Sequence, residues 1–396
     1  MLKFKKIVSF VLVAAMAATS MVACSKKESA DGAIKIGAIG PTTGGAAIYG
    51  NAVKYGAEIA IEEINAKGDI QFALNFQDDE HDAEKSVNAY NNLKDWGMQV
   101  LMGSVTTAPC VAVSAEASAD HIFELTPSAS STDVIGGFEN ESGVIEIPRK
   151  ENVFQMCFTD PNQGLASADY IYNQKIGKKI AVIYNSSDAY STGIYNKFMA
   201  RADELGLDVV SVTSFTEDTA TDFSVQITEA NKAGADLIFL PIYYTPASLI
   251  MNQAHSAGYE FKYFGVDGMD GILTLKGFDT SLAEGVMLLT PFVADADDEL
   301  TKAFVAKYTE KYGETPNQFA ADGYDAIYAI YEACKKAGVT ADMPTSDICD
   351  KLIEVFTSDS FVFNGLTGSD VTWKATGEVS KEPKGMVIKD GVYSAM

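Results

Sequence analysis

The sequence predicts an α/β fold with two lobes, each built from a parallel sheet with helices on both faces. Short apolar runs alternate with segments of helical periodicity, which is the pattern of a parallel sheet. This alternation restarts after Asp160-Pro161, so a second set of elements follows the first. The roughly 370 residues beyond the N-terminal leader also exceed the usual size of one hydrophobic core. Two similar lobes account for all three observations.

The first set of elements begins with an apolar run at 34–39, which Gly40-Pro41 ends. The segment after it places apolar residues at helical spacing between Val53 and Ile64. The set continues with a strand at 72–76, a helix at 83–95, a strand at 100–102, a helix at 108–119 and a strand at 123–125.

The second set repeats this rhythm after Asp160-Pro161. Its predicted helices lie at 164–174, 193–205, 223–232 and 247–257, and its predicted strands at 180–184, 209–213, 237–240 and 261–265. Three later helices are predicted at 298–312, 320–337 and 348–356. They have to return to one lobe or both, so the chain is expected to cross between the lobes more than once.

The first 24 residues have the plan of a secretory leader. Three lysines precede an apolar run at 7–18, and small residues follow up to Cys24. Residues 21–24 (MVAC) resemble a lipobox, in which the cysteine receives a lipid and the leader is cut just before it. We expect a signal peptide at 1–23, a flexible tether at 24–33 and a lipid anchor on Cys24. The alternative is an ordinary cleaved leader in which Cys24 is incidental.

Acidic residues dominate the charge of the chain. Removing residues 1–23 takes away three lysines and no acids, which leaves 27 basic against 54 acidic residues and a formal net charge of −27. Such a surface repels phosphate backbones, so no nucleic acid is expected as a partner. No second apolar run approaches the length of a membrane span, so we expect a soluble body held outside the cytoplasm.

The sequence offers few residues for catalysis or metal binding. Its three histidines provide no HExxH zinc helix, and neither a GxSxG elbow nor a P-loop occurs. Residues 37–45 are glycine-rich but match no nucleotide-binding pattern. Residues 78–82 (DDEHD) are interpreted as a solvated strand end rather than a cation site, because an EF-hand loop needs glycine and glutamate at fixed offsets. We expect no cofactor, no metal and no catalytic residue.

Four cysteines follow Cys24 without CxxC spacing: Cys110, Cys157, Cys334 and Cys349. They provide no disulfide framework for a chain of this size. Cys334 and Cys349 could pair if their two helices meet, but buried free thiols are the favoured interpretation.

Hydroxyl groups follow two of the predicted strands, at the edge where open α/β sheets bind ligands. Thr106-Thr107 follows one strand and precedes a helix, and Ser128-Ala129-Ser130 follows the next strand. Hydroxyls at such positions usually cap the helix. They can also turn N–H and O–H groups toward a small carboxylate, which the helix dipole favours.

Five segments carry a resemblance to a known family: 36–44 (IGAIGPTTG), 57–68 (AEIAIEEINAKG), 125–130 (LTPSAS), 153–164 (VFQMCFTDPNQG) and 264–268 (FGVDG). They resemble the branched-chain amino acid binding proteins of ABC transporters, which are type I periplasmic-binding proteins. The likeness runs from about Ile34 to the C-terminus. INAKG and TPSA are specific to that group, whereas the other motifs are shared with amide and urea binders.

The resemblance implies two Rossmann-like lobes that hold a ligand in the cleft between them, as a Venus flytrap does. Three strand crossings join the lobes, and we expect them near 158–161, 289–292 and 365–370. The N-terminal lobe then comprises 34–158 and 292–366, and the C-terminal lobe comprises 159–291 and 367–396.

The resemblance also assigns ligand-binding roles to polar residues. Thr107 matches the residue that grips the ligand α-carboxylate. Ser128 and Ser130, with Ala129 between them, match positions whose backbone and hydroxyl groups contact the carboxylate and the ammonium. Asp267 falls where the family places an acidic residue on the ammonium. Charge logic agrees, because an ammonium taken from water into a closed cleft needs an anion beside it.

Three tyrosines receive roles in the same way. Tyr49 matches an aromatic residue that lines the side-chain pocket, and Tyr190 and Tyr243 match tyrosines that the opposite lobe brings in on closure. Core packing is the alternative for each of them, and only their positions at strand ends favour the cleft.

The chain departs from the family pattern at two places. His81 and Thr106 stand where well-studied members form a disulfide, so that bridge is absent. Met269 stands where many relatives have tryptophan, and a flexible thioether there would accept several apolar side chains.

We therefore expect a lipid-anchored, extracytoplasmic, monomeric substrate-binding protein without enzymatic activity. It would capture a free amino acid, branched-chain or otherwise aliphatic, and present it to an ABC permease. A binder of amides, urea or another small ligand, in transport or sensing, is the alternative within this class, and Asp267 argues against it because a neutral amide offers no cation. A secreted hydrolase that uses an aspartate such as Asp267 or Asp79 is the alternative from another class, and the scarcity of histidine and of a second paired carboxylate argues against it.

The lipobox generates a first prediction. The variant Cys24→Ser should release the protein from membranes into the soluble fraction, because it removes the thiol that carries the lipid. Membrane fractionation followed by mass spectrometry measures this. Unchanged membrane attachment together with an unlipidated wild-type mass would contradict the assignment.

Overall fold

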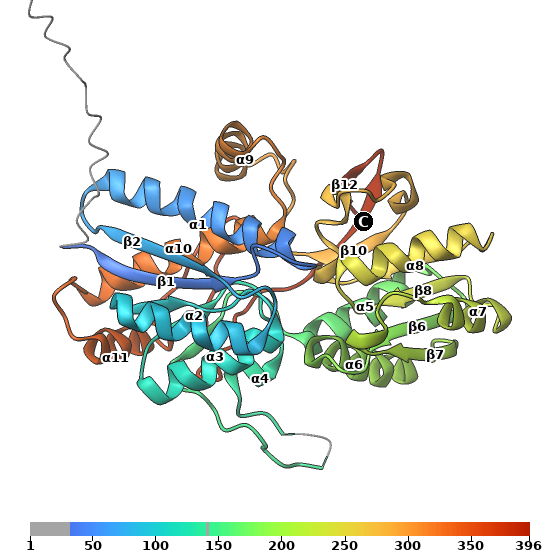
Figure 1. Cartoon of the computed structure of the whole chain (residues 1–396), viewed down its shortest axis with the longest axis horizontal. Helices are drawn as coiled ribbons and strands as arrows, with labels where there is room; N and C mark the ends of the chain where they lie inside the picture. The colour runs from blue at the N-terminus through green and yellow to red at the C-terminus, as the bar shows by residue number, and fades with distance from the viewer. Residues whose placement is uncertain (1–31, 140–141) are drawn as a thin grey trace, which may run out of the picture. The chain divides into compact units, whose positions relative to one another are not determined.

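The computed structural model describes residues 32–139 and 142–396, in which two sheets organise the chain (Figure 1). The first sheet has the order β2-β1-β3-β4-β5 with all strands parallel: β1 (Ile34–Gly40), β2 (Phe72–Asp78), β3 (Val100–Met102), β4 (Glu124–Thr126) and β5 (Val153–Gln155). The second sheet has the order β12-β11-β10-β9-β8-β6-β7: β6 (Ile180–Asn185), β7 (Val209–Phe215), β8 (Leu237–Leu240), β9 (Lys262–Gly265), β10 (Met287–Thr290), β11 (Lys384–Lys389) and β12 (Val392–Ala395). Only β11 and β12 run antiparallel to their neighbours.

Helices cover both sheets (Figure 1). Those near the first sheet are α1 (Ala47–Lys67), α2 (Ala83–Trp96), α3 (Thr107–Asp120), α4 (Thr132–Ile135), α9 (Glu299–Tyr312), α10 (Gln318–Ala337) and α11 (Thr345–Phe356). Those near the second sheet are α5 (Asp160–Gln174), α6 (Ala189–Leu205), α7 (Ser224–Lys232) and α8 (Tyr244–Ser256). Short 3-10 turns complete the chain: η1 (Glu217–Thr219), η2 (Asp267–Met269), η3 (Ile272–Thr274) and η4 (Thr280–Ala283).

The strand order determines where a ligand can enter. In the first sheet β1 lies between β2 and β3, and in the second sheet β6 lies between β7 and β8. The chain leaves the central strand to one side and later returns to the other, which makes each position a topological switch point. The loops after these strands therefore diverge and leave a crevice at the carboxyl edge of each sheet. Thr107, Tyr190 and Tyr243 all lie in or next to such loops.

Two glycines set the close contact between α1 and α10. A Cβ atom on Gly56 would stand 1.9 Å from the carbonyl oxygen of Ala320, and one on Gly323 would stand 2.5 Å from that of Val53. Any larger residue would push the helices apart. This close packing holds the N-terminus of α10 beside the cleft.

The α/β fold with two sheets is confirmed, and the predicted helices and strands are present with ends shifted by a few residues. The strands β5, β10, β11 and β12 were not predicted. They are short or pair at the edge of a sheet, where an apolar run of three or four residues carries little periodicity.

The third crossing comes later than the expected 365–370. The indole N–H of Trp373 donates to the carbonyl oxygen of Gln155 at 2.8 Å, and its ring stacks on Phe361. Lys381 still reaches Asp322 in α10, and the chain joins the second sheet only with β11. The lobe boundaries as a whole stay a prediction.

The structure also tests the expectations for the cysteines and for residues 78–82. Cys110, Cys157, Cys334 and Cys349 are buried and free, so Cys334 and Cys349 do not pair. The interpretation of residues 78–82 as a solvated strand end is wrong for Asp79. Its side chain is fully buried, and its carboxylate accepts from Ser104 and from the N–H of His81.

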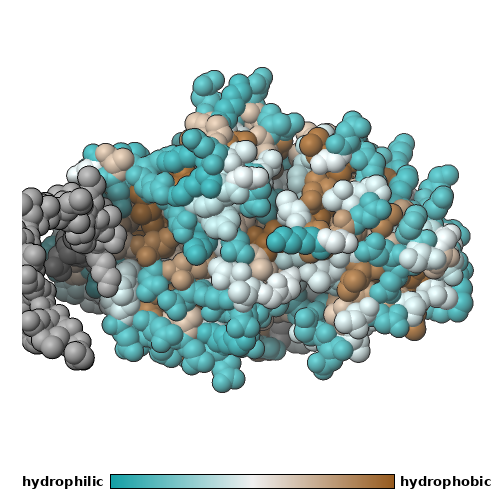
Figure 2. Space-filling model, turned by 45° about the horizontal axis from the view of Figure 1, so that its top comes forward, coloured by the Kyte–Doolittle hydropathy of each residue, from teal (hydrophilic) through white to brown (hydrophobic). Residues whose placement is uncertain are grey.

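Figure 2 shows one face of the molecule, on which hydrophilic side chains predominate and apolar ones appear mainly in recesses between them. None of the described helices combines the length and the apolar character needed to cross a lipid bilayer.

A buried ion pair provides a prediction about stability. Lys381 and Asp322 lie 3.3 Å apart with side chains 1% and 3% exposed. The variant Lys381→Met should lower the free energy of unfolding by about 3–5 kcal/mol, since it leaves a buried carboxylate without its cation. Urea denaturation at pH 8 measures this. The matched control is Lys374→Met. It removes the ion-pair partner of Glu378, but the Lys374 side chain is 66% exposed, so the cost should be about 1 kcal/mol or less. Equal effects of the two variants would contradict the prediction.

Candidate functional site

An inner cavity lies where loops of the two sheets meet, and it brings six of the predicted site residues together. Those six are Tyr49, Thr107, Ser128, Tyr190, Tyr243 and Asp267, and the other lining residues are Val105, Thr106, Gly268 and Phe319. The cavity measures ≈ 10 Å³, which is room for about one water molecule. A molecule larger than water can enter only if the rings move or the loops separate.

The first sheet contributes the N-terminus of α3. The first N–H groups of a helix have no partner within the helix, and here Thr106 is the N-cap residue. The Thr106 hydroxyl does not cap the helix, because it bonds Nδ1 of His81 at 2.8 Å. Thr107, the first residue of α3, lines the cavity at the positive end of the helix, where N–H groups lack partners within the helix. This arrangement suits a carboxylate.

Three residues after β4 were expected to bind the ligand, and only one of them lines the cavity. Ser128 lines the cavity, and its hydroxyl donates to the carbonyl oxygen of Val105 at 2.7 Å. Ala129 and Ser130 are buried but do not line it. The carbonyl oxygen of Ala129 accepts from Gln155, and that of Ser130 accepts from the N–H of Asp160. In this structure they hold the first crossing rather than face the cavity.

The second sheet contributes the carboxylate. Asp267 is 4% exposed, and the Tyr190 hydroxyl donates to its Oδ1 at 2.6 Å. The same hydroxyl accepts from the N–H of Gly268 at 2.9 Å. A Cβ atom on Gly268 would lie 2.5 Å from this hydroxyl, so a larger residue there would displace the Tyr190 side chain. Burial raises the pKa of Asp267 to about 6, although the hydrogen bonds from Tyr190 and Gln163 favour the charged form.

Aromatic rings close the remaining walls. Tyr190 and Tyr243 stack with ring centroids 4.7 Å apart, and Tyr49 lies 4.4 Å from the ring of Phe319. The Tyr49 hydroxyl donates to the carbonyl oxygen of Gly268 at 2.5 Å and accepts from the N–H of Tyr244 at 3.2 Å. Tyr49 thus links α1 of the first lobe directly to two loops of the second.

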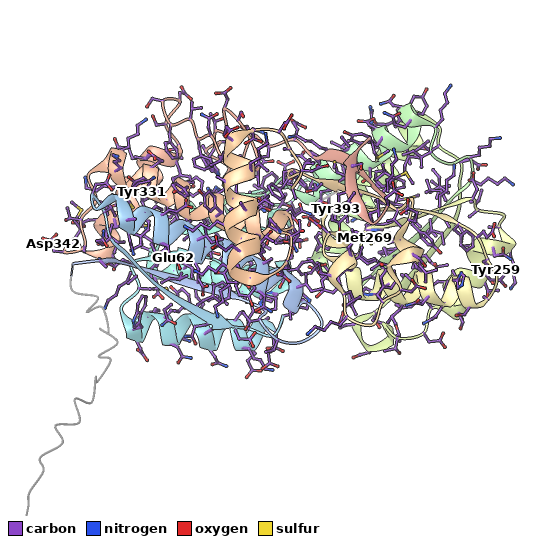
Figure 3. The ribbon with its side chains drawn as sticks, turned by 90° about the horizontal axis from the view of Figure 1, so that it is seen from above. Glu62, Tyr259, Met269, Tyr331, Asp342 and Tyr393 are labelled. Atoms are coloured by element: carbon purple, nitrogen blue, oxygen red, sulfur yellow. The ribbon has the colours of Figure 1, made fainter. Side chains whose placement is uncertain are left out.

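Phe319 was not predicted from the sequence. It follows the N-cap residue Asn317 at the start of α10, far along the chain from every other lining residue. Only the close packing of α10 on α1 brings it into the cavity. Met269, in contrast, was expected to shape the side-chain pocket, but it is fully buried and does not line the cavity. Figure 3 labels it within the second lobe, in the same region as Tyr393.

A larger outer cavity of ≈ 490 Å³ adjoins the inner one, with Tyr243 in the walls of both. From the first lobe it is lined by Gly45, Ala46, Glu80, His81, Asp82, Lys85 and Ala108, and from the second by Asn185, Ser187, Asp188, Phe215, Glu217, Ala220, Ile242, Thr245 and Pro246. The His81–Thr106 hydrogen bond stands at the boundary of the two cavities, because His81 lines the outer one and Thr106 the inner one.

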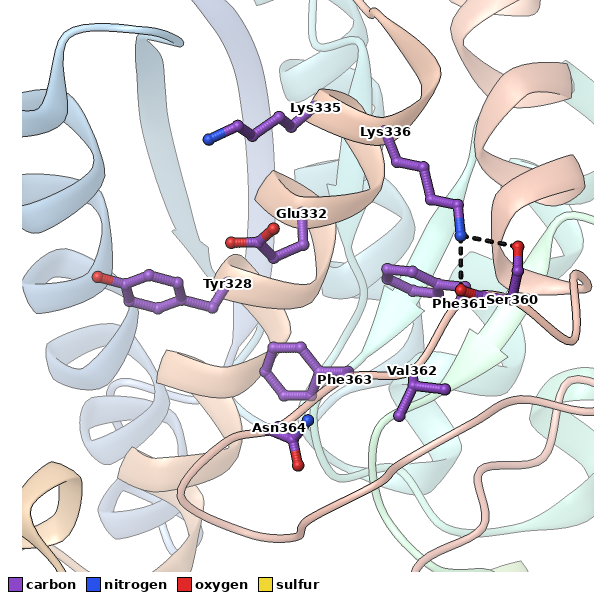
Figure 4. A pocket seen from close by; sticks show the side chains of 9 residues that line it. All are labelled: Tyr328, Glu332, Lys335, Lys336, Ser360, Phe361, Val362, Phe363 and Asn364. Atoms are coloured by element: carbon purple, nitrogen blue, oxygen red, sulfur yellow. Dashed lines mark hydrogen bonds between the residues drawn. The ribbon is translucent and has the colours of Figure 1, made fainter.

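A third hollow of ≈ 440 Å³ lies between α10 and residues 360–364 (Figure 4). Both lysines in its wall are engaged. Lys336 donates to the carbonyl oxygen and the hydroxyl of Ser360, and Lys335 pairs with Asp69. The hollow shares no residue with the two cavities of the cleft, and we do not count it as part of the site.

The profile of the periplasmic binding protein family matches residues 33–381. The chain belongs to this family. A Leu/Ile/Val-binding protein homolog from Brucella melitensis is 30% identical over 312 residues, which cover 78% of this chain and 80% of the relative.

Solved structures agree with this membership. A leucine binding protein from Thermotoga maritima superimposes with a TM-score of 0.78 at 27% identity, covering 92% of this chain and 97% of that one. A branched-chain amino acid transporter substrate binding protein from Streptococcus pneumoniae, solved with isoleucine, has a TM-score of 0.79 at 24% identity over 92% and 98% of the two chains, which shows the shared fold. The family is described as periplasmic binding proteins, and the protein from Streptococcus pneumoniae is described as the substrate binding protein of a branched-chain amino acid transporter.

In a family whose lobes close on a ligand, the Tyr49 contacts generate a prediction. The variant Tyr49→Phe removes the hydroxyl that joins the lobes and leaves two backbone groups unpaired in the closed form. It should destabilise closure by about 1–3 kcal/mol. Small-angle scattering without ligand should then give a larger radius of gyration than for the wild type. The control Tyr55→Phe lies on the same helix, stacks on Tyr312 within the first lobe, and should change nothing. An unchanged radius for Tyr49→Phe would refute the role.

Proposed function

We propose that this chain captures a free amino acid, branched-chain or otherwise aliphatic, in the cleft between its lobes and delivers it to an ABC permease. The observation that carries the proposal is the meeting of opposite polarities in one cavity. Thr107 and the N-terminus of α3 suit a carboxylate, and the Asp267 carboxylate suits an ammonium. The aromatic rings between them suit an apolar side chain. The relatives bind leucine, isoleucine and valine according to their names, which supports this choice.

The proposal also covers membrane attachment, oligomeric state and the lack of catalytic activity. We infer attachment to the outer face of the membrane through Cys24, which lies outside the described residues, together with a monomeric state and no catalytic activity. The amide or urea alternative leaves Asp267 without a cation, and burial already disfavours its charged form. The hydrolase alternative finds no support in Asp79, whose carboxylate is buried and bound by Ser104.

A thermal-shift screen of the purified protein against the twenty amino acids, urea and short amides tests the proposal. A ligand at 100 times its dissociation constant adds about 2.7 kcal/mol to the free energy of unfolding. Stabilisation by aliphatic amino acids and none by amides is the expected result. Stabilisation by amides alone would reverse the choice between the two.

Asp267 generates a further prediction. The variant Asp267→Asn keeps an acceptor for Tyr190 but removes the charge, so it should weaken amino acid binding by about 2–3 kcal/mol. The pKa of about 6 adds a pH signature. Above pH 6 the carboxylate is charged and affinity is constant, whereas below it protonation competes with the ligand ammonium and affinity falls by up to about tenfold per pH unit.

Isothermal titration calorimetry between pH 5 and pH 8 measures both effects. In the variant Asp267→Asn, both the high affinity for the amino acid and most of its dependence on pH should be lost. Near-native affinity of Asp267→Asn would remove this residue from the site and reopen the amide alternative.

A further inference from the structure

The outer cavity holds an excess of negative charge that the amino acid backbone does not use. Its walls carry the carboxylates of Glu80, Asp82, Asp188 and Glu217 against one lysine. That lysine, Lys85, pairs with Glu80 at 2.6 Å. Among the ion pairs of the described residues, none involves the other three carboxylates, and burial lowers the pKa of His81, which disfavours its charged form.

The remaining acidic groups have only weak or backbone partners. Asp188 caps α6 by accepting from the N–H of Tyr190 at 3.2 Å, and burial raises its pKa to about 6. Glu217 accepts from the side-chain amide of Asn185 at 3.3 Å. Both lie on the second lobe, while Asp82 lies on the first, so a cation between them would attract both sides of the cleft.

An aromatic wall separates the inner cavity from the outer one. Tyr243 lines both cavities, and its hydroxyl is buried without a hydrogen-bond partner among the described residues. The ring of His81 meets that of Tyr243 edge to face, with centroids 5.4 Å apart. Rings of this kind pack against methylene groups and attract cations over their faces.

The backbone turn at Glu80 and His81 holds the His81 ring beside the cleft. Glu80 and His81 have φ of 50° and 64°, in the left-handed region that few residues other than glycine adopt. The carboxylates of Asp78 and Asp79 accept from their N–H groups and hold the turn. The His81 ring is then fixed by Thr106, next to the site for the ligand carboxylate.

We propose that the outer cavity is a subsite for a cationic side chain, so that the protein also binds amino acids whose aliphatic stem ends in an ammonium or guanidinium group. This inference rests on the proposed function, since the inner cavity has to hold the ligand's own carboxylate and ammonium. The rings of Tyr243 and His81 touch in this structure and have to move apart to admit the aliphatic stem, and the terminal cation then lies among Asp188, Glu217 and Asp82. The cation joins acidic groups of both lobes and thereby favours closure.

L-Lysine and L-norleucine test this proposal, because their side chains share a four-carbon stem and differ in the terminal ammonium. Calorimetry on the wild-type protein should give lysine at least a tenfold higher affinity than norleucine. Raising the salt concentration should weaken lysine binding and leave norleucine binding nearly unchanged. Norleucine binding as tightly as lysine would overturn the proposal without any variant.

The variant Glu217→Gln tests whether the preference for lysine over norleucine arises in the outer cavity. It should lower lysine affinity at least fivefold and leave norleucine affinity unchanged. Asp218→Asn changes the net charge equally at the next position, which does not line the cavity, and serves as the matched control. An equal loss for both ligands in Glu217→Gln would overturn the subsite.

Leucine binding distinguishes a failure of the subsite proposal from a failure of the proposed function on which it rests. If leucine and norleucine bind and lysine does not, the subsite is wrong and the proposed function stands. If none of the three binds, both are wrong.

Discussion

The site depends on the burial of the Asp267 carboxylate, which is 4% exposed and has no cation beside it among the described residues. Removing a charge from water is costly unless donors surround it. Tyr190 provides one donor, and its hydroxyl also fixes the N–H of Gly268. These bonds tie the start of α6 to the loop after β9, and they leave the charge only partly compensated.

Neutral hydrogen bonds hold the two lobes together around this carboxylate. Tyr49 reaches Gly268 and Tyr244, the Thr245 hydroxyl donates to the carbonyl oxygen of Gly45, and the Gln318 amide donates to that of Asp267. Each bond contributes about 1 kcal/mol, which is enough to bias closure and too little to make it permanent. A ligand therefore shifts an equilibrium between open and closed forms. Because the outer cavity is acidic on both walls, its charges oppose closure until a cation offsets them.

Much of the fold was predictable because the main helices and parallel strands are long and strongly periodic. The run at 34–39 and the stripe from Val53 to Ile64 identify a buried strand and its helix from residue pattern alone. The strands β5 and β10 and the hairpin β11–β12 were not predictable in this way, since three to six residues show no clear period and their pairing is decided by distant partners. The late third crossing has the same cause, because Trp373 and Lys381 are held by contacts with Gln155 and Asp322.

The sequence by itself determined which chemistry was available: hydroxyls after two strands, an aspartate after a third, and tyrosines shortly after strands. Motif resemblance then predicted six residues that meet in one cavity. Only the tertiary structure decided that Phe319 joins them, that Ala129 and Ser130 turn away, and that His81 binds Thr106 and so releases the α3 terminus. The physical reason is that residue type and spacing fix local conformation, whereas side-chain partners across a cleft depend on how two separately folded sheets and their helices pack.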